Sequence, residues 1–157
     1  MKFLLALLLP LMIISCSTQY SGNYSKIEYE AGACFGFCPM FKMTINEDRT
    51  AVFEAERFNF SRDVQSQEPE GTFTATIKQE DYNKLVALLN NINVNSLNAK
   101  YGNRNVTDLP TAYLRVDFKN GNRNEVEDYG KSGTEKLEEL YDFIEELRFN
   151  QDWTKIK

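Results

Sequence analysis

Histidine is absent from this chain of 157 residues. Its imidazole is the commonest catalytic base near neutral pH and the commonest metal ligand in proteins. Catalysis by a Ser-His-Asp triad or by a Cys-His pair is therefore excluded. We expect a non-enzymatic protein without a cofactor.

Basic residues are fewer than acidic ones. The chain has 18 Lys and Arg against 23 Asp and Glu, a net charge of −5. If residues 1–15 are removed, as argued below, Lys2 leaves with them, so that 17 basic residues face 23 acidic ones and the net charge is −6. A domain this acidic is poorly suited to nucleic acid or to anionic lipid headgroups. No nucleic-acid partner is expected.

An apolar run long enough to span a membrane is also missing. The chain opens MKFLLALLLPLMIISC, in which Lys2 precedes twelve residues without a polar side chain, residues 3–14. A spanning helix needs about 20 apolar residues. A charged start, a short apolar run and a small residue at the cleavage point, here Ser15, are typical of a secretory signal peptide. Residues 3–14 are predicted to be helical and to make few contacts with the mature fold.

The end of this run, IISC, resembles a bacterial lipobox. The resemblance implies cleavage before Cys16, diacylglycerol on the Cys16 sulfur and acylation, for instance by palmitate, of the new amino group. Two or more acyl chains anchor a protein stably at a bilayer. The expected location is therefore the envelope of a Gram-negative cell. Ser17, where an Asp would retain the protein at the inner membrane, favours the outer membrane, on its periplasmic or surface side.

Three segments are expected along the chain. Residues 1–15 are the lipoprotein signal peptide, residues 16–24 the lipidated cysteine and a small, polar tether, and residues 25–157 a single domain. The 142 residues that remain after residue 15 are enough to bury a core of their own.

Period-two alternation predicts several strands. It is clearest where Phe41, Met43 and Ile45 alternate with polar residues, whereas Val52 and Phe53 are both apolar and leave the facing of their strand open. The predicted strands cover 24–30, 40–47, 51–58, 72–77, 112–118 and 122–130. For the last two we predict a hairpin loop of three residues, 119–121, with Gly121 in the left-handed conformation, because this register places Leu114 opposite Val126.

Helical spacing of apolar residues predicts one helix near 80–92 and another near 132–148, the second opened by a capping box of Ser132 and Glu135. Residues 93–110 show no period and read as a long loop. The predicted fold class is α+β, an antiparallel sheet of about five to six strands with two helices packed on one face. Trp153, the single tryptophan, is expected to pack on the core.

The remaining cysteines lie in ACFGFCP, residues 33–39. Thiols in an exported protein are oxidised, and a disulfide between Cys34 and Cys38 would close a loop of about five residues and stabilise the fold by roughly 2 kcal/mol. Gly36 permits the tight turn, and Pro39 prevents it from continuing as a helix. We predict this disulfide.

Two other uses of the pair stay open. A redox role is conceivable, although the spacing is not Cys-x-x-Cys and no βαβ pattern surrounds it. Cys34, Cys38 and Met40 are soft ligands that would suit Cu(I). The alternative function is therefore a copper-binding or thiol-redox lipoprotein. A third class, a hydrolase using Asp108 and Asp128 as paired acids, has no support from spacing.

The run CFGFCPMFKMTI resembles a group of bacterial lipoprotein-type domains of unknown function. The shared pattern is Cys-Phe-Gly-x-Cys-Pro-x-aromatic, here Cys34, Phe35, Gly36, Cys38, Pro39 and Phe41. Tyr101, TDLP at 107–110 and DYG at 128–130 are also similar, so that the resemblance covers about 25–147. The turn EDRT, at 47–50, departs from it by lacking a glycine. The resemblance implies a fold but no mechanism.

Our leading hypothesis is an envelope lipoprotein with a binding or structural domain. Aromatic residues beside a rigid turn make contacts at low entropic cost. The candidate binding surface is Phe35, Gly36, Phe37, Tyr101, Asp108 and Pro110. The expected partners are the membrane, through the lipid anchor, and an envelope protein or a small ligand.

Overall fold

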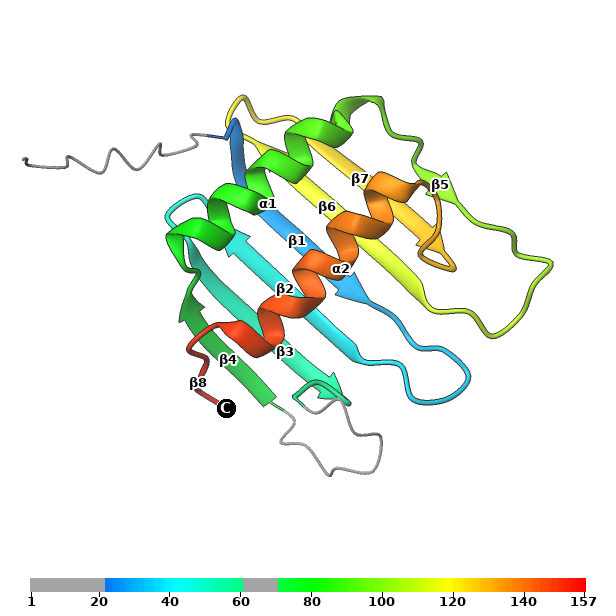
Figure 1. Cartoon of the computed structure of the whole chain (residues 1–157), viewed down its shortest axis with the longest axis horizontal. Coiled ribbons are helices and arrows are strands. Elements are labelled where there is room, and N and C mark those ends of the chain that lie inside the picture. Colours follow the sequence, from blue (N-terminus) through cyan, green and yellow to red (C-terminus); the bar gives the residue numbers. More distant parts are fainter. Residues whose placement is uncertain (1–21, 61–70) are drawn as a thin grey trace, which may run out of the picture.

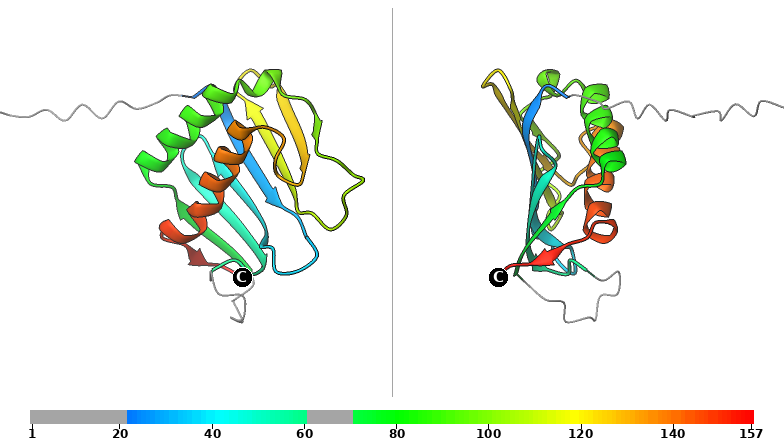
Figure 2. Two further views of the ribbon diagram at one scale, coloured as in Figure 1. Left: turned by 45° about the vertical axis from the view of Figure 1, so that its right-hand side comes forward. Right: turned by 90° about the vertical axis from the view of Figure 1, so that its left-hand side faces the viewer.

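The computed structural model of the chain describes residues 22–60 and 71–157 (Figure 1). The predicted signal helix at 3–14, Cys16 and most of the tether lie outside the described residues. The domain has two layers, a twisted sheet and a pair of helices that cover one of its faces (Figure 2). No helix within 22–60 and 71–157 is long and apolar enough to cross a membrane.

Eight strands form one sheet in the order β5-β7-β6-β1-β2-β3-β4-β8. All neighbours are antiparallel except β5 and β7, which are parallel. The strands are β1 Tyr24–Ala31, β2 Met40–Asn46, β3 Thr50–Arg57, β4 Gly71–Thr76, β5 Lys100–Tyr101, β6 Thr111–Phe118, β7 Arg123–Tyr129 and β8 Thr154–Lys155.

The predicted antiparallel sheet of five to six strands is therefore wrong in two respects. The structure adds two edge strands, β5 and β8, of two residues each, and β5 makes the sheet mixed. Two residues are too short to show a period, so these strands left no pattern in the sequence. The α+β class and the two helices on one face are confirmed (Figure 1). The predicted loop at 93–110 also contains a short 3-10 helix, η1 Val94–Ser96.

Side-chain alternation divides the sheet into a core face and a helix-free face. Phe41, Met43 and Ile45 of β2 are buried, as their alternation predicts. In β3 the core side chains are Ala51, Phe53 and Ala55, which settles the facing that the sequence left open. Phe53 is placed at the centre of the core, 5.4 Å from the Phe41 ring and 5.2 Å from the Trp153 ring. The expected packing of Trp153 is thus confirmed.

Two helices cover the core face, α1 Gln79–Ile92 and α2 Glu135–Asn150. The predicted stripe of α2 is fully buried: Leu137, Leu140, Tyr141, Ile144 and Leu147. The predicted capping box of Ser132 and Glu135 is wrong, because the N-cap of α2 is Thr134, two residues after Ser132. The Thr134 hydroxyl accepts a hydrogen bond of 3.1 Å from the Leu137 N–H, which satisfies one of the free donors of the first turn.

The hairpin of β6 and β7 has the predicted register. Leu114 is paired with Val126, and Val116 with Asn124. The Phe118 N–H donates to the Asn122 carbonyl oxygen at 2.8 Å, which leaves a loop of three residues. Gly121 has a φ of +86°, the left-handed conformation that this loop requires. Both parts of the prediction are confirmed.

Candidate functional site

The loop between β1 and β2 carries the two cysteines. Their Cα atoms lie 5.8 Å apart and their sulfur atoms 1.91 Å apart, which places the pair at disulfide distance, as predicted. Gly36, midway between them, has a φ of +131°, and no atom would lie within 4 Å of an added Cβ. The loop therefore turns tightly in open solvent around Gly36.

A second loop, residues 102–110 between β5 and β6, lies against the first. The Phe35 N–H donates a hydrogen bond of 3.2 Å to the Asp108 carbonyl oxygen, and the Gly32 N–H donates one of 2.8 Å to the Thr111 carbonyl oxygen. The loops lie together because β1 and β6 are neighbours, with Ala31 paired to Ala112 where both loops leave the sheet. Two segments that are distant in sequence thus form one surface.

Tyr129, at the end of β7, holds the second loop in place. Its hydroxyl donates to the Val106 carbonyl oxygen at 2.8 Å and accepts from the Leu109 N–H at 3.3 Å. The Arg104 guanidinium stacks 4.4 Å from the centroid of the Tyr129 ring and pairs with Glu127. The Tyr129 side chain therefore ties the second loop to the sheet, and the backbone bond from Phe35 to Asp108 ties the first loop to the second.

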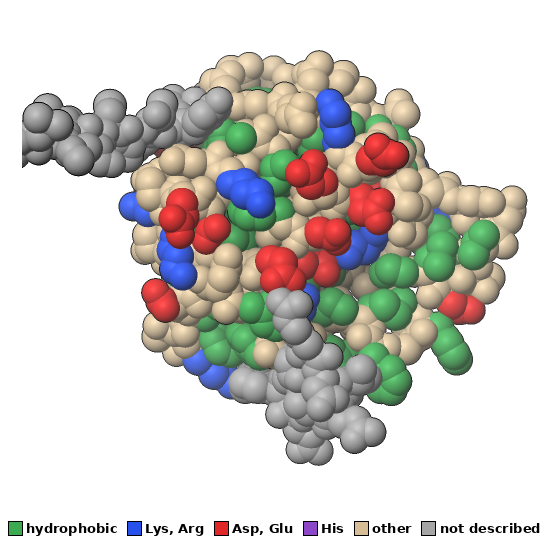
Figure 3. All heavy atoms as spheres, in the orientation of Figure 1, with side chains coloured by type: hydrophobic (Ala, Val, Ile, Leu, Met, Phe, Trp, Pro, Cys, Tyr) green, Lys and Arg blue, Asp and Glu red, His purple; other side chains and the backbone are tan. Residues whose placement is uncertain are grey.

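Large apolar side chains project from these two loops. The exposed fractions are 86% for Phe35, 66% for Phe37, 48% for Val106 and 37% for Leu109. We call these four residues the apolar tip. Figure 3 shows hydrophobic side chains gathered at this side of the molecule, over the region of both loops. Exposed apolar groups that are adjacent, and not scattered singly, mark contact surfaces.

The predicted binding residues divide between the tip and its support. Phe35, Gly36 and Phe37 project at the tip, and Asp108 is exposed beside them with a φ of +69°. Tyr101 instead packs against the core, and its hydroxyl accepts a hydrogen bond of 3.0 Å from the Asn98 N–H. Pro110 is half-buried, and its carbonyl oxygen accepts from the Gly130 N–H at 2.8 Å. Tyr101 and Pro110 therefore support the loop at residues 102–110 and do not project from it.

The sequence analysis missed Val106, Leu109, Arg57 and Phe58. Arg57 ends β3, and its guanidinium lies 5.1 Å from the centroid of the Phe58 ring. The Phe58 ring meets the Phe37 ring edge to face at 5.6 Å. No local pattern marks these residues, because their position beside the tip depends on the neighbouring strands β2 and β3.

The acid pair Asp108 and Asp128 does not form one site. Asp128 is fully buried, and its carboxylate accepts a hydrogen bond of 2.9 Å from the Gly133 N–H, whereas Asp108 faces solvent. Burial, followed by the charge of Asp128, raises the pKa of Tyr141. Asp128 thus holds the connection from β7 to α2.

The copper alternative meets an obstacle in the same loop. Sulfur atoms at disulfide distance are not thiolates, so Cys34 and Cys38 cannot act as metal ligands in this state. Met40 is half-buried at the start of β2. Within residues 22–60 and 71–157, no group of three or more His, Cys, Asp or Glu side chains could hold a metal ion.

The helix-free face of the sheet carries a network of ion pairs. Arg115 is its centre and contacts Glu28 at 3.1 Å, Glu30 at 2.8 Å and Glu125 at 3.0 Å. Desolvation alone would lower the pKa of Arg115, but its hydrogen bonds to Glu30 and Glu125 outweigh that and raise the pKa. This face is thus charged but internally compensated.

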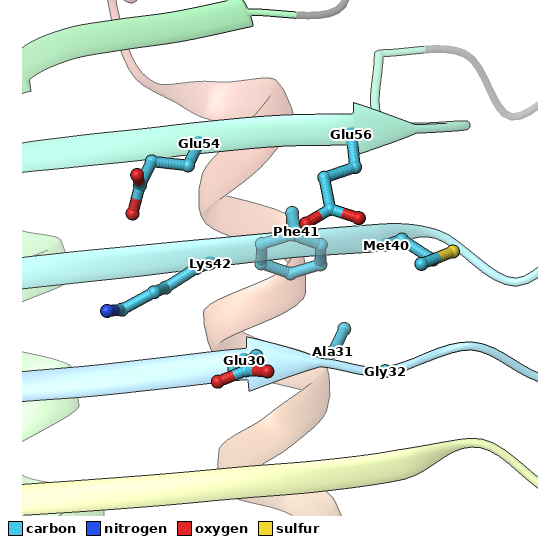
Figure 4. A pocket seen from close by; sticks show the side chains of 8 residues that line it. All are labelled: Glu30, Ala31, Gly32, Met40, Phe41, Lys42, Glu54 and Glu56. Carbon is cyan, nitrogen blue, oxygen red and sulfur yellow. The ribbon is translucent and has the colours of Figure 1, made fainter.

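A hollow of about 280 Å³ lies at one end of this face, between β1, β2 and β3 (Figure 4). The side chains of Glu30, Glu54, Glu56 and Lys42 border it on the side away from the helices (Figure 4). Ligand sites usually have volumes of about 300–1,000 Å³ and are mostly apolar. This hollow is acidic and small, and we assign no ligand to it.

On the other face, a partly buried charged group lies between β1 and α2. The Tyr29 hydroxyl donates to the Glu145 carboxylate at 2.7 Å, and the Lys131 ammonium pairs with the same oxygen. Burial, and next the charge of Glu145, raise the pKa of Tyr29. These bonds fix α2 on the sheet, while the Lys131 and Glu145 side chains stay partly exposed.

One protein family matches the chain, a domain of unknown function, DUF6438, over residues 25–148. The matched region begins within β1 and ends within α2, so it includes the whole apolar tip. Comparison with curated proteins gives no match.

Proposed function

The chain belongs to the DUF6438 family, whose function is unknown, and on that premise we propose that it is an envelope lipoprotein whose domain binds a partner through the apolar tip. The observation that carries the proposal is the exposure of Phe35 and Phe37, at 86% and 66%, on a loop closed at Cys34 and Cys38. Leaving two phenylalanines in water forfeits about 1.5–3 kcal/mol each relative to burial. A partner that covers them recovers this free energy.

Binding suits the chemistry of the tip better than catalysis does. The four tip side chains, of Phe35, Phe37, Val106 and Leu109, are hydrocarbon and offer neither a nucleophile nor an acid or base. They are also held rigidly, by the closed loop and by the bond from Phe35 to Asp108. Rigid apolar groups bind at low entropic cost because little freedom is lost on contact.

The anchor is proposed from the sequence. Residues 3–14 and the IISC run support cleavage and lipidation at Cys16, six residues before Gly22, where the described chain begins. β1 then runs from Tyr24 to Ala31, so the tip lies at the far end of this strand from the anchored end (Figure 1). A lipid-anchored domain would present the tip along the direction of β1.

Mass spectrometry of the N-terminal peptide tests the anchor. The mature protein should begin at Cys16 and carry the added mass of three acyl chains. The Cys16→Ala variant should lack this mass and should not be cleaved at the same bond. A wild-type protein with an unmodified Cys16 thiol would refute the anchor and would leave the binding surface to be tested by itself.

Photo-crosslinking tests the binding surface. p-Benzoylphenylalanine placed at position 35 of the full-length chain should form an adduct in native envelopes. The same group at position 120, in the hairpin loop at the opposite end of the sheet, is the matched control and should form none. Equal capture at both positions, or no capture at position 35, would contradict binding at the tip.

A further inference from the structure

Arg57 differs from the other arginines within residues 22–60 and 71–157. Each of the others makes a hydrogen bond or an ion pair: Arg49, Arg104, Arg115, Arg123 and Arg148. Arg57 is exposed, and its guanidinium makes no hydrogen bond or ion pair with the described residues but lies 5.1 Å from the centroid of the Phe58 ring. In a domain with more acids than bases, this guanidinium has all its hydrogen-bond donors free among the described residues.

Phe58 connects Arg57 to the apolar tip. It adopts a φ of +57°, a conformation that is unusual for a bulky residue and costs of the order of 1 kcal/mol or more. In this conformation the ring stacks with Arg57 and also meets the Phe37 ring edge to face at 5.6 Å. The backbone is thus held in a strained state that places a cation beside an exposed aromatic group.

We propose that Arg57 and Phe37, joined by Phe58, form one recognition element for a protein partner that presents an apolar pocket beside a carboxylate. This inference rests on the proposed binding function of the tip and names the chemistry of the partner. Arginine and the aromatic residues, including Phe, are enriched in protein interfaces relative to the rest of the surface. A guanidinium that is already stacked on a ring keeps its in-plane donors free for a bidentate carboxylate.

Charge favours such a protein partner over a membrane surface and over a second copy of the chain. A membrane surface rich in anionic lipid would repel a domain with a net charge of −6 after loss of residues 1–15. A second copy, bound tip to tip about a twofold axis, would bring two Arg57 guanidinium groups close to each other. A carboxylate on a different protein meets neither objection.

The test combines the crosslinking of position 35 with charge reversal. The protein captured in native envelopes is identified and purified, and its affinity for the full-length wild-type protein in detergent is measured by titration calorimetry. Arg57→Glu should weaken this affinity at least tenfold. Lys119→Glu, an equal change of charge in the hairpin loop at the other end of the sheet, should change it less than twofold. Restoring affinity to Arg57→Glu by reversing one carboxylate of the partner would identify the pair.

Each other outcome overturns the inference. If Arg57→Glu and Lys119→Glu changed the affinity equally, the partner would not recognise the charge of Arg57. Binding at the apolar tip would be unaffected by that result. An adduct with phospholipid, together with binding of the protein to vesicles of phosphatidylethanolamine and phosphatidylglycerol, would make the occupant a membrane. An adduct with a second copy would make the tip a dimer interface.

Arg57→Lys, which keeps the charge but loses the planar fork, should retain partial affinity. The melting temperature of this variant serves as the check on folding.

Discussion

The backbone N–H of Phe35 lies 3.2 Å from the carbonyl oxygen of Asp108 and donates a hydrogen bond to it. This contact joins the loop that follows β1 to the loop that precedes β6. Both loops leave the sheet at the same end, because β1 and β6 are antiparallel neighbours. The exposed side chains of the two loops therefore form one apolar tip, and no single segment of the chain contains it.

The disulfide should stabilise the domain without being needed for folding. Replacing Cys34 and Cys38 together by Ala opens a loop of about five residues, for which chain entropy gives roughly 2 kcal/mol. We expect a melting temperature lower by several degrees and an unchanged far-ultraviolet circular dichroism spectrum. Wild-type protein treated with dithiothreitol should melt like the double variant. Two titratable thiols in native, unreduced protein would contradict the pairing and revive the copper hypothesis.

Arg115 should contribute more to stability than Arg123, another cation of the helix-free face. In Arg115→Met, Glu28, Glu30 and Glu125 lose a shared partner, and Glu28 is 8% exposed. Since Arg115 and its glutamate partners are partly open to solvent, we expect Arg115→Met to lower the free energy of unfolding by about 1–3 kcal/mol. Arg123→Met is the control and should lose less than about 1 kcal/mol, because the Arg123 side chain is 43% exposed. Urea denaturation measures both, and equal losses would contradict the central role of Arg115.

Gly121 should be required for its backbone conformation alone. Its φ is +86°, and no atom lies within 4 Å of the position of an added Cβ. Gly121→Ala should therefore destabilise the domain by about 1 kcal/mol through strain and not through a clash. Gly121→Asn should cost less, since Asn tolerates the left-handed region better than Ala does. Thermal unfolding of both variants decides the matter, and a neutral Gly121→Ala would show that the loop adopts another turn.

Stability should fall at alkaline pH through the buried tyrosines. Burial and Glu145 raise the pKa of Tyr29, so the folded state favours the neutral phenol. This contribution is fully present below the unfolded pKa of about 10 and is lost as the pH rises through the folded pKa. In urea titrations from pH 8 to 11.5, Tyr29→Phe should reduce the alkaline loss, while costing about 1 kcal/mol at pH 8 through the lost hydrogen bond to Glu145. Tyr113→Phe, on the helix-free face, is the control, and equal slopes for the two variants would contradict the assignment.

Local patterns were sufficient for the main elements of the fold. The period of two in β2, with Phe41, Met43 and Ile45 buried, follows from the pleat of a strand whose other face lies in solvent. The loop of the hairpin at 119–121 followed from matching Leu114 to Val126, because only that register buries one apolar face. The cap of α2 was misplaced by two residues, since Ser132 and Thr134 are both suitable caps and only the start of the helix distinguishes them.

The candidate site could be predicted only in part. The spacing of Cys34 and Cys38 around Gly36 pointed to the closed loop and to Phe35 and Phe37. Val106 and Leu109 have no such marker, and Tyr101, which was predicted to lie in the binding surface, is partly buried against the core. Exposure depends on what the rest of the chain places nearby, and a single segment does not contain that information.

By itself the sequence determined which residues form strands and helices, how the β6–β7 hairpin turns, and that the two cysteines could meet, because each of these depends on contacts between residues close in the chain. The tertiary structure alone decided the order of the strands, the parallel pairing of the edge strand β5 and the backbone hydrogen bond between Phe35 and Asp108. It also placed Arg57 and Phe58 beside Phe37, through the pairing of β2 with β3. These features arise from long-range pairing, whose free energy depends on all the strands together and not on the pattern of any one of them.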